Sequence, residues 1–406
     1  MAALDNILTI DEMKTKARRS VPKMFFEYAD SGSYTEGTYR DNESDFNKIK
    51  LKQKVAVNLE GRNLSTEMLG KAITMPVAIA PAATGGMQVA DGEIKAARAA
   101  EKYGIPFTLS TMAVCSIEDV AENTTAPFWF QLYVMRDRGF IERLIDRAKA
   151  AKCSALVLTM DLQILGQRHK DIHNGLATPP KFNAYSIWQM MQHPLWCARM
   201  LGTKRHTFRN IVGHVGGDHD LASLSAWTAS QFDPTLNWAD IAWVKKRFGG
   251  PVIVKGVLDA DDAQAAIDNG ADAIVVSNHG GRQLDGAPST IRVLPEIVER
   301  VGHKTEVYLD SGIRSGQDVL KAMAYGAKGT FIGRPMLYGL GAGGEAGVTR
   351  VLDIIRKELD TTMALCGERD ILNVGLHNIY SNDIPARNAP VSSPLPSGER
   401  STRSVG

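Results

Sequence analysis

The chain has 406 residues, of which 44% are hydrophobic and 23% are charged, and its formal net charge is +2. This apolar fraction is typical of a soluble protein with a large core, and so small a charge argues against nucleic acid as a partner. No run of about 18 apolar residues is present, so the sequence predicts no membrane-spanning helix. The start of the chain lacks the apolar stretch of a secretory signal, and the scattered cysteines favour reduced thiols in the cytoplasm.

Short apolar runs recur along the chain, and most are continuous, as parallel strands covered on both faces would be. They occupy residues 77–83, 106–111, 127–134, 155–161, 251–257, 273–280, 306–312 and 329–335. Helical patterns separate or follow them at 92–103, 116–123, 138–152, 238–248, 259–269, 289–301, 315–325 and 345–365. This alternation predicts an α/β fold, a single (β/α)8 TIM barrel within residues 1–384 that is preceded by an N-terminal helical segment.

Two segments depart from the alternation. Roughly ninety residues separate the fourth and fifth strands, too many for one crossover, so a long insertion is expected at 172–232. Residues 172–217 contain no Asp or Glu, but they contain aromatic and long apolar residues interleaved with Lys181, Arg199, Lys204, Arg205 and Arg209. That mixture suits contact with the surface of a membrane, here its cytoplasmic face; an active-site lid is the alternative. The tail at 385–406, rich in Pro, Ser and Arg, is expected to be disordered.

The sixth strand leads into the most informative stretch of the chain, SNHGGRQLD at 277–285. His279 is a proton acceptor near neutral pH, and Arg282 offers a planar fork that suits a carboxylate. The two glycines between them allow the backbone to bend or a ligand to approach closely. Active sites of such barrels lie at the C-terminal ends of the strands, so this stretch suggests an enzyme that removes a proton from a carboxylic acid.

The longer run SNHGGRQLDG resembles the FMN-dependent α-hydroxy acid oxidase and dehydrogenase family, and the resemblance extends from residue 10 to residue 369. It implies that the protein is an enzyme that oxidises an L-2-hydroxy acid, with FMN as cofactor. The segment PFTLSTMAVCSIEDV, the DRGF that follows Tyr133 and the acid-free insert are most similar to bacterial quinone-linked L-lactate dehydrogenases. This similarity implies L-lactate as the substrate, a quinone or another carrier as electron acceptor, and a homotetramer.

The resemblance also implies roles for single residues. His279 matches the catalytic base, and Asp161, in LTMD, matches the carboxylate that pairs with its imidazole. Arg282 and Arg168 match two arginines at the substrate carboxylate, where a guanidinium supplies orientation as well as attraction. The two active-site hydroxyls of the family match Tyr28 and Tyr133.

The cofactor site is implied in the same way. Lys255, in IVKG, matches the lysine that faces the flavin and stabilises the negative charge that builds there. The segments DSGIR and IGRP match the family's phosphate loops, in which backbone N–H groups and arginines surround a dianion. The remaining implied contacts are Ala82, Ala83, Ser110, Gln131, Thr159, Ser277, Asp310, Gly312, Arg314, Gly333 and Arg334.

The sequence leaves other functions open. The first is an oxidase that passes electrons to oxygen and takes a longer or aromatic substrate. Met112 and Leu165 are expected to border the substrate side chain, and Gln163 and Leu165 replace the proline of some lactate enzymes in the family. A nucleotide dehydrogenase is rejected because the loop after the sixth strand has no cysteine. A protein that only stores flavin is disfavoured, because it would bury the charged catalytic residues at a cost in stability and gain no activity from them. No metal is expected, because the sequence lacks an HExxH motif.

Overall fold

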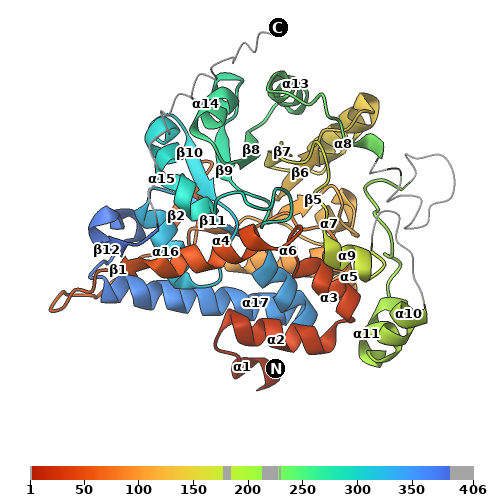
Figure 1. Cartoon of the computed structure of the whole chain (residues 1–406), viewed down its shortest axis with the longest axis horizontal. Helices are drawn as coiled ribbons and strands as arrows, with labels where there is room; N and C mark the ends of the chain where they lie inside the picture. The colour runs from red at the N-terminus through yellow and green to blue at the C-terminus, as the bar shows by residue number, and fades with distance from the viewer. Residues whose placement is uncertain (1, 177–183, 213–226, 228–229, 385–406) are drawn as a thin grey trace, which may run out of the picture.

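A computed structural model describes residues 2–176, 184–212, 227 and 230–384 of the chain (Figure 1). Eight parallel strands are ordered β4-β11-β10-β9-β8-β7-β6-β5, and a parallel bridge between Ile79 and Phe107 joins the two end strands. The strands are β4 Val77–Ile79, β5 Thr108–Ser110, β6 Trp129–Tyr133, β7 Ala155–Thr159, β8 Val252–Val257, β9 Ala273–Val276, β10 Glu306–Leu309 and β11 Gly329–Ile332. The predicted (β/α)8 barrel is confirmed.

Side chains alternate between the inside and the outside of each strand, and this alternation decides what the barrel contains. A separate cluster of buried apolar side chains includes Ala78, Trp129, Val157, Ile253, Val275, Tyr308 and Phe331. Two residues farther along their strands, the same inward face carries the buried polar residues Gln131, Thr159, Lys255, Ser277 and Asp310. An apolar floor therefore lies beneath a polar layer at the C-terminal ends of the strands, where barrel enzymes place their active sites.

Most strands end earlier than the sequence predicted. The prediction for β9 ran to residue 280, but the strand ends at Val276, because His279 (φ +57°), Gly280 (φ +67°) and Gly281 (φ +71°) leave the ladder with positive φ angles. The apolar pattern located the strand correctly, and its last predicted residues form the loop that carries the site.

Helices alternate with the strands and surround the barrel (Figure 1). They are α6 Gly92–Tyr103, α7 Ile117–Ala121, α8 Arg138–Ala150, α13 Ala239–Phe248, α14 Ala260–Asp268, α15 Thr290–Val301, α16 Gly316–Ala324 and α17 Arg334–Leu365. The last of them was predicted to begin at residue 345 and begins at Arg334. Its two halves meet at Gly343 and Gly344, whose backbone angles are not helical, and the glycine-rich sequence before this break hid the first half.

The N-terminal segment is helical, as predicted, and α17 packs against α2. A capping box between Thr9 and Glu12 starts α2. The segment comprises α1 Ala2–Asp5, α2 Ile10–Ser20, α3 Lys23–Ala29 and α4 Gly37–Lys48. Small elements complete the described chain: β1 Ile49–Leu51, which pairs with β12 Ile379–Asn382, the hairpin of β2 Thr66–Met68 and β3 Lys71–Ile73, the short helix α5 Gly85–Gln88, and the 3-10 turns η1 Ile371–Asn373 and η2 Leu376–Asn378.

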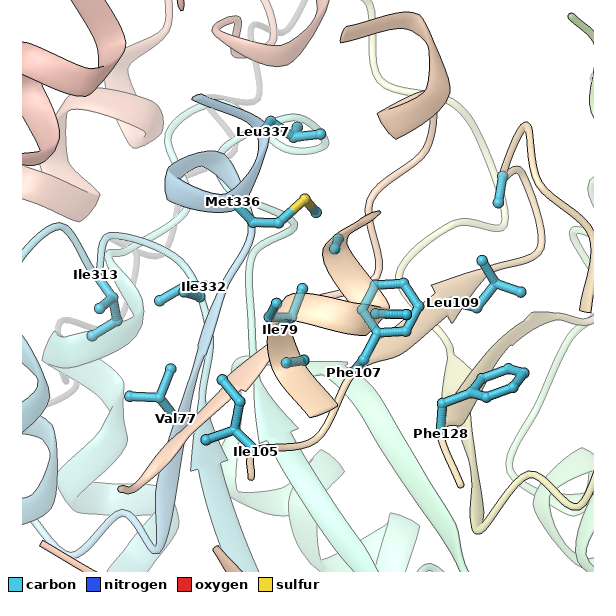
Figure 2. Close-up of a cluster of buried hydrophobic side chains, with 14 of the residues drawn as sticks. Val77, Ile79, Ile105, Phe107, Leu109, Phe128, Ile313, Ile332, Met336 and Leu337 are labelled. Atoms are coloured by element: carbon cyan, nitrogen blue, oxygen red, sulfur yellow. The ribbon is translucent and has the colours of Figure 1, made fainter. Parts of the chain in front are cut away.

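Outward-facing apolar side chains pack the strands against the helices. Figure 2 shows this core where the first and last strands meet, with Val77 and Ile79 of β4 beside Phe107, Ile332 and Met336. Met336 and Leu337 belong to the first turn of α17, so the C-terminal helix covers the seam of the barrel. Burial of each such side chain stabilises the fold by about 1.5–3 kcal/mol relative to exposure.

The insertion after β7 begins with α9 His169–His173 and continues through α10 Ala184–Met191 and α11 Pro194–Leu201. In Figure 1, α10 and α11 lie beyond α3 at the edge of the molecule. The Trp196 ring stacks on Phe25 of α3 at 5.2 Å between ring centroids, and its indole N–H donates to Met87 O. Lys181, expected to contact a membrane, and the tail at 385–406, expected to be disordered, lie outside the described residues.

The second half of the insert is bonded to the barrel. Asn210 is fully buried; its side chain accepts from Ile117 N at 2.9 Å and donates to Ser110 O at 3.2 Å. Arg205 pairs with Asp91 and with Asp119, at 2.9 and 3.0 Å. These bonds connect the insert to the end of β5, to α7 and to the start of α6.

Asn210→Ala should lower the free energy of unfolding by about 2–3 kcal/mol, because buried backbone groups would lose their partners. Chemical denaturation measures the change, and the exposed Asn373→Ala serves as the control with an expected change within about 0.5 kcal/mol. An Asn210→Ala protein as stable as the control would contradict the proposed anchoring of the insert.

Candidate active site

A cavity of about 480 Å³ opens at the C-terminal ends of the strands. Its walls come from the N-terminal helices, from all eight strands or the loops that follow them, and from the insert. The predicted site residues that line it are Tyr28, Ala82, Ala83, Tyr133, Arg168, Lys255, His279, Arg282, Asp310, Gly312, Arg314, Gly333 and Arg334. The sequence therefore located residues that are far apart in the chain and adjacent in space.

His279 and Asp161 form a pair at the mouth of the barrel. His279 Nδ1 lies 2.9 Å from Asp161 Oδ1, and both side chains are largely buried. Burial would raise the pKa of Asp161, but the His279 ring and Lys255 hold it below its ordinary value. Burial lowers the pKa of His279, and Asp161 opposes this shift only in part. The pair is therefore set to be an ionised carboxylate beside a neutral imidazole at neutral pH.

Arg282 and Arg168 line the same cavity as His279. Arg282 Nη1 donates to the carbonyl oxygens of Tyr28 at 2.6 Å and Ser31 at 3.2 Å. Its guanidinium lies over the Tyr28 ring, 4.8 Å from the ring centroid. These contacts fix the orientation of the Arg282 fork. Two guanidiniums and two tyrosines beside one imidazole can bind an anionic substrate close to a base.

Lys255, on the strand next to β7, belongs to a buried hydrogen-bonded group. Its ammonium donates to Ser277 Oγ at 2.8 Å and lies 3.0 Å from Asp310 Oδ2, which also accepts from Ser277 at 2.7 Å. Burial alone would raise the pKa of Asp310, but Lys255 and Ser277 keep it low. The group fixes the Lys255 ammonium at the cavity wall, where Asp310 balances its charge.

Four predicted cofactor contacts, Ser110, Gln131, Thr159 and Ser277, are buried at strand ends but are not among the residues that line the cavity. Ser110 Oγ donates to Gln131 Oε1 at 3.0 Å. Gln131 Nε2 and Thr159 Oγ1 are buried without a hydrogen-bond partner in the described part of the chain. A buried polar group without a hydrogen-bond partner lowers the stability of the fold, and the polar edge of a flavin ring would supply such partners.

The loops after β10 and β11 suit a phosphate. Gly312 (φ +97°) packs so closely that a Cβ there would lie 2.1 Å from Asn42 O. Arg334 is buried; it donates to Ser31 O at 2.7 Å and lies over the Tyr39 ring at 4.5 Å. Arg314 pairs with Glu43 at 2.8 Å. Two guanidinium groups in fixed positions beside a glycine turn suit the phosphate of FMN. The polar residues of the cavity and of the strand ends therefore agree with this cofactor.

Sequence reasoning missed Asp171. This buried carboxylate lines the cavity, 4.0 Å from Arg168 Nη1 and 3.9 Å from Arg282 Nη2. Burial raises its pKa, and the two arginines oppose the shift. The spacing of Arg168 and Asp171, three residues apart at the start of a short helix, was the one signal in the sequence.

The apolar wall of the cavity was only partly foreseen. Met112 and Leu165 line it, as expected, but so do Phe208 and Phe232 from the insert. The Phe232 ring lies edge-on to Tyr133, with 6.2 Å between ring centroids. Gln163 does not line the cavity; its side chain donates to Leu236 O at 2.7 Å. The glutamine that replaces proline at position 163 therefore affects the conformation of its loop and makes no contact with the cavity.

Comparison with known proteins agrees with this geometry. A model of the FMN-dependent dehydrogenase family matches residues 17–381. An L-lactate dehydrogenase of Ectopseudomonas mendocina is 43% identical over 365 residues, or 89% of this chain and 96% of that protein. An L-lactate dehydrogenase of Stenotrophomonas maltophilia is 44% identical over 371 residues, or 91% and 98%.

Solved structures of 2-hydroxy acid dehydrogenases and oxidases are also similar to this chain. The monotopic membrane protein (S)-mandelate dehydrogenase is 34% identical with a TM-score of 0.88, covering 93% of this chain and 100% of its own. A lactate oxidase of Pediococcus acidilactici is 33% identical with a TM-score of 0.77, covering 92% and 94%. With the family model matching almost the whole barrel, this chain belongs to the FMN-dependent dehydrogenase family, and FMN is its cofactor.

Proposed function

We propose that this protein oxidises an L-2-hydroxy acid, first of all L-lactate, to the 2-oxo acid, and that a quinone or another carrier at a membrane reoxidises its FMN. The observation that carries the proposal is the buried contact of 2.9 Å between His279 Nδ1 and Asp161 Oδ1, with His279 and two arginines lining one cavity. L-Lactate is supported by the relatives of that name that are 43% and 44% identical.

The chain's own residues divide the work of binding and proton transfer. Arg282 and Arg168 bind the substrate carboxylate, and the hydroxyls of Tyr28 and Tyr133 hold the carboxylate and the reacting oxygen. His279 uses Nε2 to take a proton from the substrate, because Nδ1 is engaged by Asp161. Asp161 stabilises the imidazolium that forms.

FMN, when bound, accepts the two electrons that leave the hydroxy acid. Lys255 would stabilise negative charge on the flavin, and Gln131, Thr159 and Ser110 would offer polar atoms to it. Arg314, Arg334 and the backbone at Gly312 and Gly333 would hold the phosphate, with Asp310 and Ser277 fixing Lys255. Ala82 and Ala83 line the cavity that would hold the cofactor.

An oxidase is the second candidate. The lactate oxidase and a mandelate oxidase at 31% identity share the fold, and the apolar cavity wall with Phe232 beside Tyr133 would accept a larger side chain than that of lactate. Such an enzyme would pass electrons to oxygen and release hydrogen peroxide.

Membrane contact would be made by an exposed patch on α10 and α11, which we call the insert patch: Tyr185, Ile187, Trp188, Met191, Leu195 and Leu201, each between 52% and 86% exposed. Arg199 and Lys204 lie next to it in the chain and would meet anionic headgroups. No helix in the described part of the chain is long and apolar enough to cross a bilayer. The neighbour described as a monotopic membrane protein supports peripheral attachment.

Anaerobic mixing with L-lactate should bleach the flavin absorbance of the purified protein, and D-lactate should not, because the arginine pair and His279 fix one face of the α-carbon. A screen of longer and aromatic L-2-hydroxy acids belongs in the same experiment, followed by a comparison of a soluble quinone with oxygen as acceptor. Bleaching by no 2-hydroxy acid would refute the proposal. Stoichiometric peroxide in air would favour the oxidase.

Replacing Trp188, Met191, Leu195 and Leu201 together by Ser should move the enzyme from the membrane to the soluble fraction at unchanged kcat. Substitution is preferable to deletion, since Asn210 and Arg205 bond the rest of the insert to the barrel. The matched control replaces four other exposed apolar residues, Val55, Leu365, Leu372 and Leu376, by Ser. An unchanged distribution, or an equal shift in the control, would count against the insert patch.

A further inference from the structure

The loop that follows His279 is bonded to three separate segments. Arg282 reaches the carbonyls of Tyr28 and Ser31. Asp285 accepts from Thr35 N at 3.0 Å and from Thr38 N at 2.9 Å. Gln283, between them, is directed to the loop after β7, which carries Asp161. Each of these side chains therefore fixes a different neighbour of the loop.

Gln283 uses both ends of its amide. Its Nε2 donates to Asp161 O at 2.7 Å and to Ile164 O at 2.8 Å, and its Oε1 accepts from Gly166 N at 3.1 Å. A Cβ at Gly166 would lie 2.7 Å from the carbonyl oxygens of Arg282 and Gln283, so the two loops touch backbone to backbone. Both donor hydrogens and the acceptor oxygen of one side chain are committed to this contact.

Asp161 needs such a support. Asp161 lies beyond Thr159, where β7 ends, so pairing with a neighbouring strand no longer fixes its backbone. Asp161 Oδ2 is buried without a hydrogen-bond partner in the described structure, and the contact with His279 is made by Oδ1. The bond from Gln283 to the Asp161 carbonyl therefore connects Asp161 to the His279 loop a second time.

We propose that Gln283 is a positioning residue for the proton-transfer pair: it holds the Asp161 carboxylate against His279 Nδ1 by fixing the backbone of Asp161 to the loop that carries the base. This inference rests on the proposed function, since it takes His279 as the base. Gln283 is not among the residues that line the cavity, so its loss removes no contact with substrate or FMN.

The surroundings of His279 determine the direction of the expected effect. Asp161 raises the pKa of the imidazole, whereas burial and the cations Lys255 and Arg168 lower it, and Asp310 faces it from β10. If Asp161 swings away, the lowering influences dominate and the pKa of His279 falls. The imidazole then stays neutral, but the imidazolium formed during turnover loses its partner.

Gln283→Leu, which keeps the approximate volume and removes all three hydrogen bonds, should lower kcat at least about tenfold. KM should stay within about threefold, and flavin absorbance and melting temperature should be near those of the wild type. The acid limb of the pH profile of kcat/KM should move to lower pH. Nitrogen-15 NMR of the histidine rings, with His279→Gln to assign the signal among the nine histidines, should show the same fall in the ring pKa without turnover.

Two further variants separate positioning from general stability. Gln283→Glu keeps an acceptor for Gly166 N but loses both donors, so it should resemble Gln283→Leu. Asp285→Asn weakens the anchoring of the same loop to residues 35–38, and it should lower the melting temperature while kcat stays within about threefold.

The inference would be overturned if Gln283→Leu turned over within twofold of an active wild type, or if its lost activity came with lost flavin and an unchanged ring pKa of His279. An equal loss of kcat in Asp285→Asn would also overturn it, because general loop anchoring would then suffice. A wild type that oxidises no 2-hydroxy acid would refute the proposed function instead, and the NMR titration would still report whether Gln283 controls the pair.

Discussion

A carboxylate and an imidazole share one hydrogen bond in a buried position at the mouth of the barrel, and the surrounding structure keeps them there. Burial acts against the charge on either group: it raises the pKa of Asp161 and lowers that of His279. The His279 ring and Lys255 reverse the effect on the pKa of Asp161, whereas Lys255 and Arg168 reinforce the effect on the pKa of His279. The result is an imidazole that is unprotonated near neutral pH beside a carboxylate that is already charged.

The same electrostatic constraint organises the rest of the cavity. Lys255 has Asp310 as its counter-charge, whereas Arg168 and Arg282 share the single carboxylate of Asp171, so one positive charge is left to meet the carboxylate of a substrate. Contacts of 3.9 and 4.0 Å leave the two guanidiniums free to take a carboxylate in bidentate geometry. The cavity is thus able to bind an anionic substrate and an anionic cofactor without burying an unpaired charge.

The sequence predicted the barrel because continuous apolar runs and helical patterns alternate eight times, and it predicted the site because polar residues follow the runs. It could not predict where β9 ends, since a positive φ at His279 depends on the loop it enters. It also missed Asp171, Phe208 and Phe232, which reach the cavity from the insert, a segment without a periodic pattern. The sequence showed that Gln163 replaces a proline of some relatives, but only the fold shows that its amide bonds to Leu236.

The SNHGGRQLD stretch at 277–285 contains structural residues as well as His279 and Arg282. His279 and Arg282 face the cavity, whereas Gln283 and Asp285 face neighbouring segments of the chain. A stretch of nine residues therefore contains both the proposed chemistry and the bonds that fix its geometry.

The most direct measurement is the rate constant of flavin bleaching by L-lactate, or by the best substrate of the screen, after rapid anaerobic mixing with the His279→Gln protein. If His279 is the base that Asp161 supports, the rate constant should fall by about 10²–10⁴-fold while the protein retains its FMN and its yellow colour. Bleaching within about threefold of the wild-type rate would show that the proton leaves by another route and would contradict the role given to the pair.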